Sequence, residues 1–125
     1  MAKFKLPILL AMLTLTVAIV QATVITTFLT ENVPITLTAG TQQSGVDRSS
    51  SILADITGHT LTVIFTQNLG DVTIEVSNEA GFPIDLDLIG TPNGYQCYIP
   101  LAGHYTVVFK LDNGDEYSGE FDVTN

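Results

Sequence analysis

Acidic side chains cluster at a position where the sequence predicts a tight turn. Asp112, Asp115 and Glu116 surround the dipeptide Asn113-Gly114. Hard cations such as Ca²⁺ bind several oxygen ligands on a flexible loop, and this turn carries the ligand types. It lacks the ligand spacing and the closing bidentate glutamate of an EF-hand loop. The three acids are therefore candidates for a calcium site, with a solvated acidic turn as the alternative.

The chain has two histidines, His59 and His104. Two imidazoles can hold a metal together with carboxylates, but these two lack the i, i+4 spacing of a helical pair. We interpret both as surface residues. The serines are not part of a Gly-x-Ser-x-Gly elbow, so the sequence does not predict a hydrolase. We expect no catalytic residues and no cofactor, and we predict that the protein is not an enzyme.

A short apolar run predicts the orientation of the single cysteine. Tyr95, Cys97 and Ile99 alternate with polar positions, so Cys97 is interpreted as a small core residue. Tyr98 then lies on the opposite face and is exposed. An exposed aromatic ring can stack on a sugar or anchor a protein contact, which makes Tyr98 a candidate ligand contact. A cross-strand surface pair is the alternative.

A second tyrosine is predicted to have a structural role. Tyr105 follows Gly103 by two residues at the start of an alternating run. Its hydroxyl is expected to bond back to nearby backbone, as in the tyrosine corner of sandwich domains. Plain core packing is the alternative.

The charge balance excludes one class of function. The 125 residues carry 13 acidic and 4 basic side chains, a formal charge of −9. A nucleic-acid binder needs clustered Lys and Arg to displace phosphate counterions, so no nucleic-acid partner is expected. The acidic charge also opposes binding to anionic lipid.

The first 22 residues have the zones of an export signal. Lys3 and Lys5 precede the apolar run 6–20, and Val20 and Ala22 are small residues at the −3 and −1 positions. The run is shorter than the roughly 20 residues that span a bilayer. We therefore predict cleavage after Ala22, export of the mature protein and no membrane insertion afterwards. Without Lys3 and Lys5, two cations and 13 acids remain, for a charge of −11.

The remainder is predicted to be all-β. Residues 23–32 are a leader or first strand, and 33–125 form one domain. Apolar residues alternate with polar ones in several runs, which is the mark of half-buried strands: 59–66, 71–77, 83–88, 95–99, 105–109 and 117–123. Shorter strands are expected at 33–37 and 52–56, with a loop between them.

The connections are too short for parallel crossovers, so the sheet is antiparallel. Seven or eight short strands at this spacing favour an immunoglobulin-like sandwich.

Residues near the C-terminus resemble a known family. Two segments are similar to the C-terminal end of DUF3244, a family of small exported Bacteroides-like proteins. They are 101–109, which contains Gly103 and Tyr105, and the hairpin 110–123. Arg48-Ser49 and the runs 61–65 and 68–76 extend the resemblance to roughly 35–123. It implies an immunoglobulin-like sandwich and a secreted bacterial origin, with a location in the periplasm or at the cell surface of a Gram-negative bacterium, and it implies no activity. The chain end is also similar to type IX secretion tails, but lacks their basic terminal residue.

Two hypotheses of function follow. The first is a non-catalytic secreted module that binds an unknown protein or glycan. The second is a structural protein that assembles by strand exchange or edge pairing, since 23–37 is apolar and β-rich and could pass between copies. The first hypothesis follows from the predicted export and fold, and the second also predicts self-association.

Overall fold

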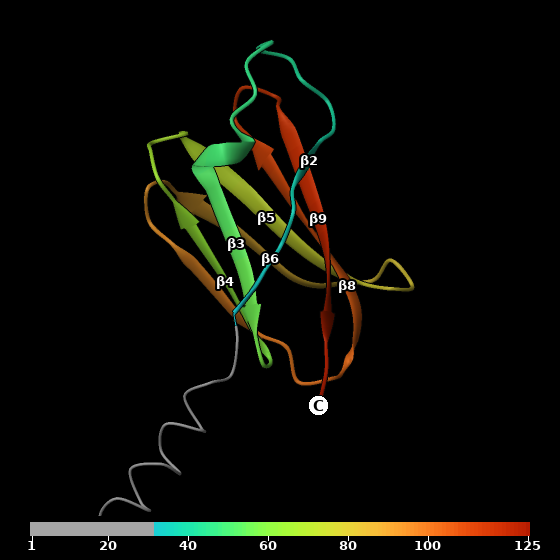
Figure 1. Cartoon of the computed structure of the whole chain (residues 1–125). Coiled ribbons are helices and arrows are strands. Elements are labelled where there is room, and N and C mark those ends of the chain that lie inside the picture. The colour runs from blue at the N-terminus through green and yellow to red at the C-terminus, as the bar shows by residue number, and fades with distance from the viewer. Residues whose placement is uncertain (1–31) are drawn as a thin grey trace, which may run out of the picture. The chain divides into compact units, whose positions relative to one another are not determined.

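The computed structural model describes residues 32–125, which form two antiparallel sheets (Figure 1). One sheet has the order β1 (Val33–Pro34), β3 (Ile52–Thr57), β4 (Thr60–Phe65), β7 (Tyr95–Tyr98). The other has the order β2 (Thr38–Ala39), β9 (Glu116–Val123), β8 (Gly103–Leu111), β5 (Asp71–Asn78), β6 (Pro83–Gly90). A 3₁₀ turn, η1 (Ser49–Ser51), precedes β3. The predicted antiparallel sandwich is thus confirmed, while the expected signal at 1–22 lies outside the described residues.

The core lies between the two sheets and consists of the inward side chains predicted by the alternation. In β8, Tyr105, Val107 and Phe109 are all buried. Phe109 meets Phe65 of the facing sheet edge to face, with ring centroids 6.4 Å apart. Twenty buried apolar residues form this one cluster. The described residues include no helix that is long and apolar enough to cross a membrane.

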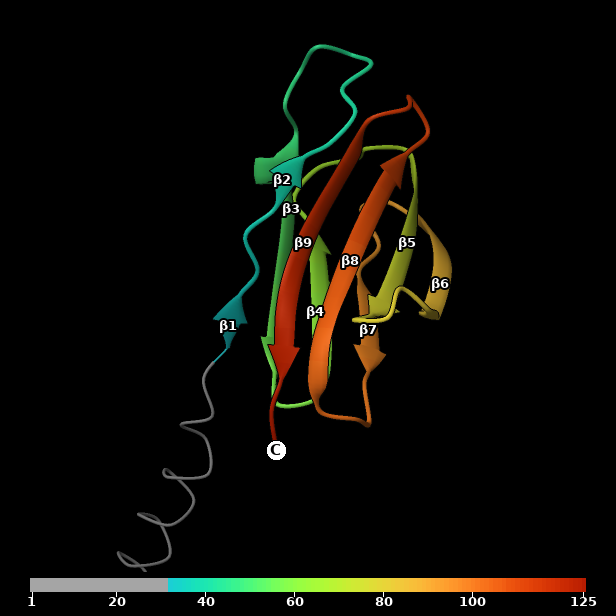
Figure 2. The same cartoon turned by 90° about the vertical axis from the view of Figure 1, so that its right-hand side faces the viewer.

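The expected strand at 33–37 is instead divided between the two sheets. Val33 and Pro34 pair with β3, and Thr38 and Ala39 pair with β9, so the segment crosses one open side of the sandwich (Figure 2). Ile35 lies between the two pairings and is buried. Its side chain enters the gap between the sheets, and the chain must bend there to reach the second sheet. One straight strand cannot satisfy both pairings.

Two glycines act through their backbone geometry. Gly114 closes the β8–β9 hairpin with φ +94°, a conformation that the Asn-Gly dipeptide tolerates. Gly119 of β9 lies beneath the crossing segment. A β-carbon there would stand 2.6 Å from Ile35 Cγ2 and 3.0 Å from the Thr36 carbonyl oxygen. The close approach of the segment to β9 therefore requires glycine at 119.

Candidate functional site

Exposed apolar side chains gather along one edge of the sandwich. Ten large hydrophobic residues are exposed among residues 32–125, and six of them belong to β6, the turn before it, the end of β7 and the β7–β8 connection. We call these six the β6 surface: Phe82, Ile84, Leu86, Leu88, Tyr98 and Leu101. All but Ile84 are more than 60% exposed. Ile84, Tyr98 and Leu101 of this set line one pocket, whereas Leu86 and Leu88 lie on the outer face of the five-stranded sheet. Exposed apolar side chains that gather at one edge mark an interaction site more often than scattered ones do.

The orientation of β6 corrects the prediction from the sequence. The alternation at 83–88 predicted that Leu86 and Leu88 face the core, but both are exposed on the outer face of the sheet. Asp85 and Asp87 occupy the inner face, because they pair with the buried Val76 and Ile74 of β5. The two acids therefore share one face. β6 is the outermost strand, and the facing sheet ends at β7, so no second layer covers the end of this sheet.

A hydrogen bond explains why an acid is placed on the inner face. The Tyr95 hydroxyl donates to Asp85 Oδ2, which ties β7 to β6 across the open side of the sandwich. Burial, followed by this hydrogen bond, raises the pKa of Tyr95 well above its ordinary value, so the phenol stays protonated. A leucine at 85 would leave that hydroxyl without its acceptor. The edge therefore needs the acidic face inside and the apolar face outside.

Cys97 packs against the core but is only partly buried. Burial raises the pKa of its thiol, which disfavours the reactive thiolate. The interpretation of Cys97 as a packing residue fits this placement.

Tyr98 projects from the end of β7, on the face opposite the buried Tyr95, as the alternation predicted. Its ring lies 5.9 Å from the His59 ring, centroid to centroid, at a tilt of 31°. The His59 ring is fixed in turn, since its Nδ1 lies 2.7 Å from the Ile99 carbonyl oxygen. This support makes Tyr98 an exposed aromatic platform.

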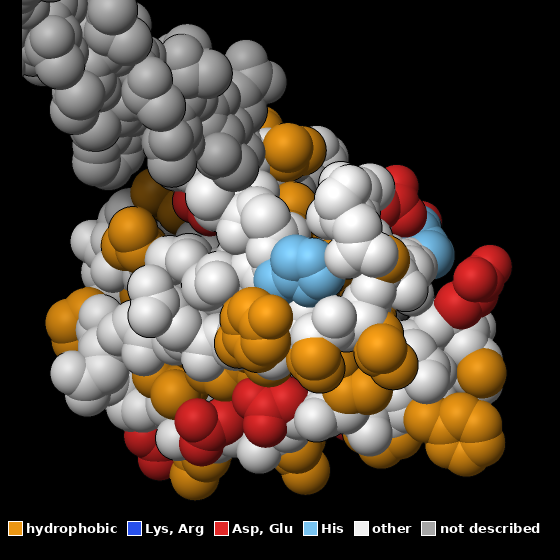
Figure 3. Space-filling model, turned by 90° about the horizontal axis from the view of Figure 1, so that it is seen from below, with side chains coloured by type: hydrophobic (Ala, Val, Ile, Leu, Met, Phe, Trp, Pro, Cys, Tyr) orange, Lys and Arg blue, Asp and Glu red, His pale blue; other side chains and the backbone are white. Residues whose placement is uncertain are grey.

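Beside Tyr98 is a small apolar pocket of about 220 Å³. It is lined by Ile84, Cys97, Tyr98, Ile99, Pro100, Leu101 and Tyr105. This volume suits one side chain better than a drug-sized ligand, whose pockets start at about 300 Å³. Figure 3 shows hydrophobic groups around a histidine on this end of the molecule, with acidic groups beside them. No basic side chain of the described residues is visible in that view.

The β7–β8 connection is held by Tyr105. Its hydroxyl donates to the Leu101 carbonyl oxygen over 2.6 Å, and its ring stacks on Phe121 with centroids 5.8 Å apart. The hydroxyl thus bonds to backbone four residues upstream, as in a tyrosine corner. A β-carbon at Gly103 would come within 3.7 Å of the Tyr105 ring, which is ordinary contact. The bond from Tyr105 positions Leu101, within the connection, on the β6 surface.

Asp115 has a structural role that the sequence did not indicate. Its carboxylate is fully buried and accepts bonds from the backbone N–H groups of Gln43 (2.7 Å) and Ser44 (2.9 Å). The Ser44 hydroxyl donates to the other oxygen over 2.5 Å. The hydrogen bonds from Ser44, in particular, lower the pKa of Asp115. The acid thus anchors the loop between β2 and η1 to the β8–β9 hairpin.

The other two acids of the turn do not join Asp115. Asp112 turns toward β5, where its Oδ2 lies 3.4 Å from the Asp71 amide nitrogen. Glu116 begins β9 and pairs with Lys110. Among residues 32–125 no three His, Cys, Asp or Glu side chains come together to hold a metal ion. The calcium hypothesis therefore has no supporting geometry in the described residues.

The two histidines share no contact partner. His59 contacts the Tyr98 ring and the Ile99 carbonyl oxygen, as described above. His104 lies on the outer face of β8, with Nδ1 2.7 Å from Asp122 and Nε2 3.6 Å from Glu120. The hydrogen bond that His104 donates to Asp122, above all, raises the pKa of His104.

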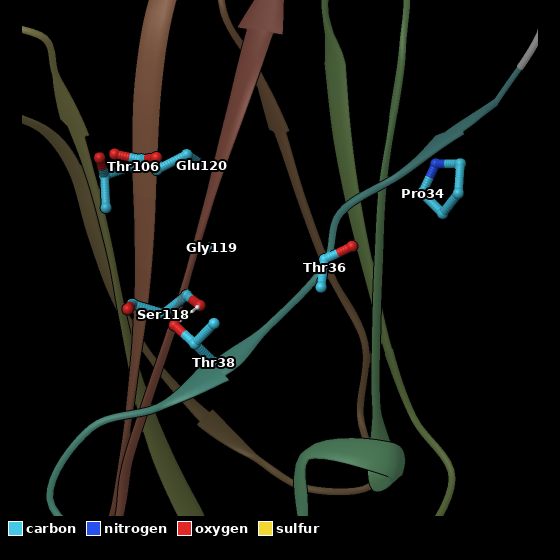
Figure 4. Close-up of a pocket in the computed structure, with 7 residues that line it drawn as sticks. All are labelled: Pro34, Thr36, Thr38, Thr106, Ser118, Gly119 and Glu120. Carbon is cyan, nitrogen blue, oxygen red and sulfur yellow. Dashed lines mark hydrogen bonds between the residues drawn. The ribbon is translucent and has the colours of Figure 1, made fainter.

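A polar groove lies on another side of the molecule, between the crossing segment and β9 (Figure 4). Its lining is mostly hydroxyl-bearing: Pro34, Thr36, Thr38, Thr106, Ser118, Gly119 and Glu120. It contains no aromatic ring on which a sugar could stack. The Thr38 hydroxyl is directed to the Ser118 carbonyl oxygen at 3.4 Å. The β6 surface is therefore the stronger candidate.

Most of the β6 surface was not predicted from the sequence. Tyr98 was identified because its neighbours alternate, but Leu86 and Leu88 were assigned to the core. One signal bears on the position of the strand: charged residues that point inward are a feature of edge strands. The pattern alone favours acids on the outer face, so the inward orientation had to come from the structure.

Comparisons with known proteins agree on the fold and are otherwise limited. The structure is similar to the crystal structure of a DUF3244 family protein with an immunoglobulin-like β-sandwich fold from Bacteroides vulgatus. The two share 18% identity with a TM-score of 0.61, over 74% of this chain and 98% of that one. No family model and no curated protein matches the sequence. The resemblance noted in the sequence is confirmed at the level of the fold, which is immunoglobulin-like.

Proposed function

We propose that the protein is a secreted, non-catalytic binding module and that its partner docks on the β6 surface. The observation that carries this proposal is the concentration of exposed apolar side chains there. Tyr98 and Leu101 are 69% and 72% exposed, beside a pocket sized for one side chain. Aromatic anchors next to such pockets are the usual centres of protein interfaces. The export signal at 1–22 belongs to the same proposal.

The surroundings of Tyr98 favour a protein partner over a glycan. A sugar that stacks on a ring also needs hydrogen-bonding side chains near the ring edge. The pocket beside Tyr98 is lined mainly by aliphatic side chains, including Ile84 and Leu101. Such a lining matches an apolar side chain of another protein.

The test compares two matched surface variants. Leu86→Glu alters the β6 surface, and Leu53→Glu alters an exposed leucine on the outer face of the other sheet (51% exposed). Both positions are exposed, so each change should alter stability by less than about 0.5 kcal/mol. Tagged protein is incubated with extract of the producing cells, and captured proteins are identified by mass spectrometry. We expect Leu86→Glu to lose the partner and Leu53→Glu to keep it; equal capture by both refutes the assignment of the surface.

The crossing segment at 33–39 supports a second candidate function, strand exchange between copies. Its strands pair with the sheets at only two residues each, and Ile35 and Leu37 pack against the core. A segment held by so few contacts can detach and occupy the same position on another copy. Light scattering tests this candidate directly: a dimer that forms at high concentration and is lost on deletion of the segment supports exchange, and a monomer at all concentrations refutes it.

A further inference from the structure

The four sheet edges of the described residues differ greatly in length. β1 and β2 are two residues long and β7 is four, whereas β6 extends over eight residues, Pro83–Gly90. Figure 2 shows β6 at the outer side of the five-stranded sheet, away from β9. A long open edge is a template for pairing with another strand. β6 is therefore the edge of the described domain most able to accept one.

The register determines which backbone groups of β6 are free. The Thr91 N–H donates to the Gly70 carbonyl oxygen over 3.1 Å, at the end of the β5–β6 ladder. Bonding residues alternate along an antiparallel strand, so Asp85, Asp87 and Ile89 bond to β5 as Thr91 does. The N–H and C=O groups of Leu86 and Leu88 then point to the open side. The Leu88 N–H is outside the β5 ladder and donates to Asp87 Oδ1 of its own strand at 2.9 Å, a bond that an added strand must replace.

The side chains of β6 disfavour a second copy of this chain as the added strand. Antiparallel pairing of two β6 strands with their apolar faces aligned places Asp85 and Asp87 opposite the same acids of the other copy. Like charges directly opposite destabilise a strand pair. The net charge of −9 adds repulsion between copies. The acids thus act as a protection against self-pairing, and they attract cations.

We propose that β6 binds an extended segment of a partner protein in which apolar and basic residues alternate, and that this segment becomes a further strand of the five-stranded sheet. The proposal rests on the proposed function and specifies the partner's chemistry. Lysines or arginines of the segment face Asp85 and Asp87. Its apolar side chains lie beside Leu86 and Leu88 on the outer face, and an apolar residue at one end enters the pocket beside Tyr98.

The probe is a synthetic peptide that alternates valine and lysine and is long enough to span β6. Two N-methylated isomers separate strand addition from surface adhesion. In one isomer, methyl groups replace the amide hydrogens that would face β6. In the other isomer, they replace the amide hydrogens that would face away from β6. Strand addition requires only the first set. Binding to the purified protein is measured by fluorescence anisotropy, and the affected amides are located by NMR.

We expect the unmodified peptide and the second isomer to bind alike and the first isomer to lose binding. The largest amide shifts should fall on Leu86 and Leu88. The variants Asp85→Asn and Asp87→Asn preserve the shape and the hydrogen-bond acceptors but remove the charges. The double variant should weaken binding about five-fold at low salt, from two cross-strand ion pairs. Asp55→Asn, on the other sheet, is the matched control and should have no effect.

Three outcomes overturn strand addition: equal binding of both N-methylated isomers, equal binding of a valine–glutamate peptide, or no binding of the unmodified peptide. If the Leu86→Glu variant still loses its partner from cell extract in that case, the proposed function stands without strand addition. If Leu86→Glu and Leu53→Glu capture alike, the proposed function fails. Light scattering provides one more outcome. If the protein forms dimers that Leu86→Glu breaks, the added strand comes from a second copy of this chain and the proposal of a basic partner segment is wrong.

Discussion

The closest backbone approach around the crossing segment allows one substitution to be analysed in detail. In Gly119→Ala the added β-carbon lies 2.6 Å from Ile35 Cγ2, 2.9 Å from Leu37 Cδ2 and 3.0 Å from the Thr36 carbonyl oxygen. Two of these atoms end flexible side chains, but the third is backbone. Side-chain rotation alone therefore cannot relieve the contact, and the segment must move away from β9.

The cost can be bounded in two ways. If the segment shifts and stays attached, overpacking of this kind costs about 1–3 kcal/mol. If it detaches, the protein loses the burial of Ile35, which contributes about 1.5–3 kcal/mol. Both routes give about 2 kcal/mol. A domain of this size has roughly 5–15 kcal/mol of stability, so the variant should still fold.

Urea unfolding and hydrogen exchange together test this reasoning. The chain has no tryptophan, so unfolding is followed by tyrosine fluorescence and circular dichroism. We expect the midpoint to fall by about 1 M urea. The Ile35 amide, bonded to the Ala54 carbonyl oxygen at 2.9 Å, and the Gly40 amide, bonded to Glu116 at 2.8 Å, should lose protection. The Val107 amide in the centre of β8 should keep it.

Two controls make the result interpretable. Ser118→Ala changes the neighbouring residue, whose side chain points to the outer face, and should cost less than about 0.5 kcal/mol. Adding Ile35→Ala to Gly119→Ala removes the side chain that the new methyl group meets, so the two costs should sum to more than the double variant shows. An unchanged midpoint with intact protection at Ile35 would refute the close-approach argument.

Two further predictions concern hydrogen bonds. Tyr105→Phe removes the bond to the Leu101 carbonyl oxygen and keeps the ring, so thermal unfolding should show a loss of about 1 kcal/mol; no loss would mean that the corner bond contributes nothing. For Asp115, the hydrogen bonds lower the pKa in the folded protein below the ordinary value of about 3.9. The contribution of the Asp115 carboxylate to stability is therefore present above that pH, and it is lost as the pH falls through the folded-state pKa. The stability difference between the protein and Asp115→Asn, measured by urea unfolding, should therefore shrink below about pH 4; a constant difference would contradict the assignment.

The sequence alone determined the strands and their inner faces wherever a strand is covered by the facing sheet. In β5, β8 and β9, period-two alternation coincides with burial because each strand has one covered and one open face. The β8–β9 turn was also predictable, since Gly114 of the Asn-Gly dipeptide adopts the positive φ that glycine tolerates. Tyr105 belongs here too, because its corner bond reaches only four residues back along the chain.

Only the tertiary structure decided the features that depend on where a strand lies in the sheet. The alternation in β6 defines two faces without saying which is buried; its place at the sheet edge and the Tyr95 hydroxyl opposite Asp85 decide that. Asp115 became a loop anchor because Ser44, 71 residues earlier, is folded against it. The segment at 33–39 divides because the edges of two sheets lie within its reach. A local pattern specifies geometry within a strand, whereas burial and hydrogen-bond partners come from chain segments that the pattern does not contain.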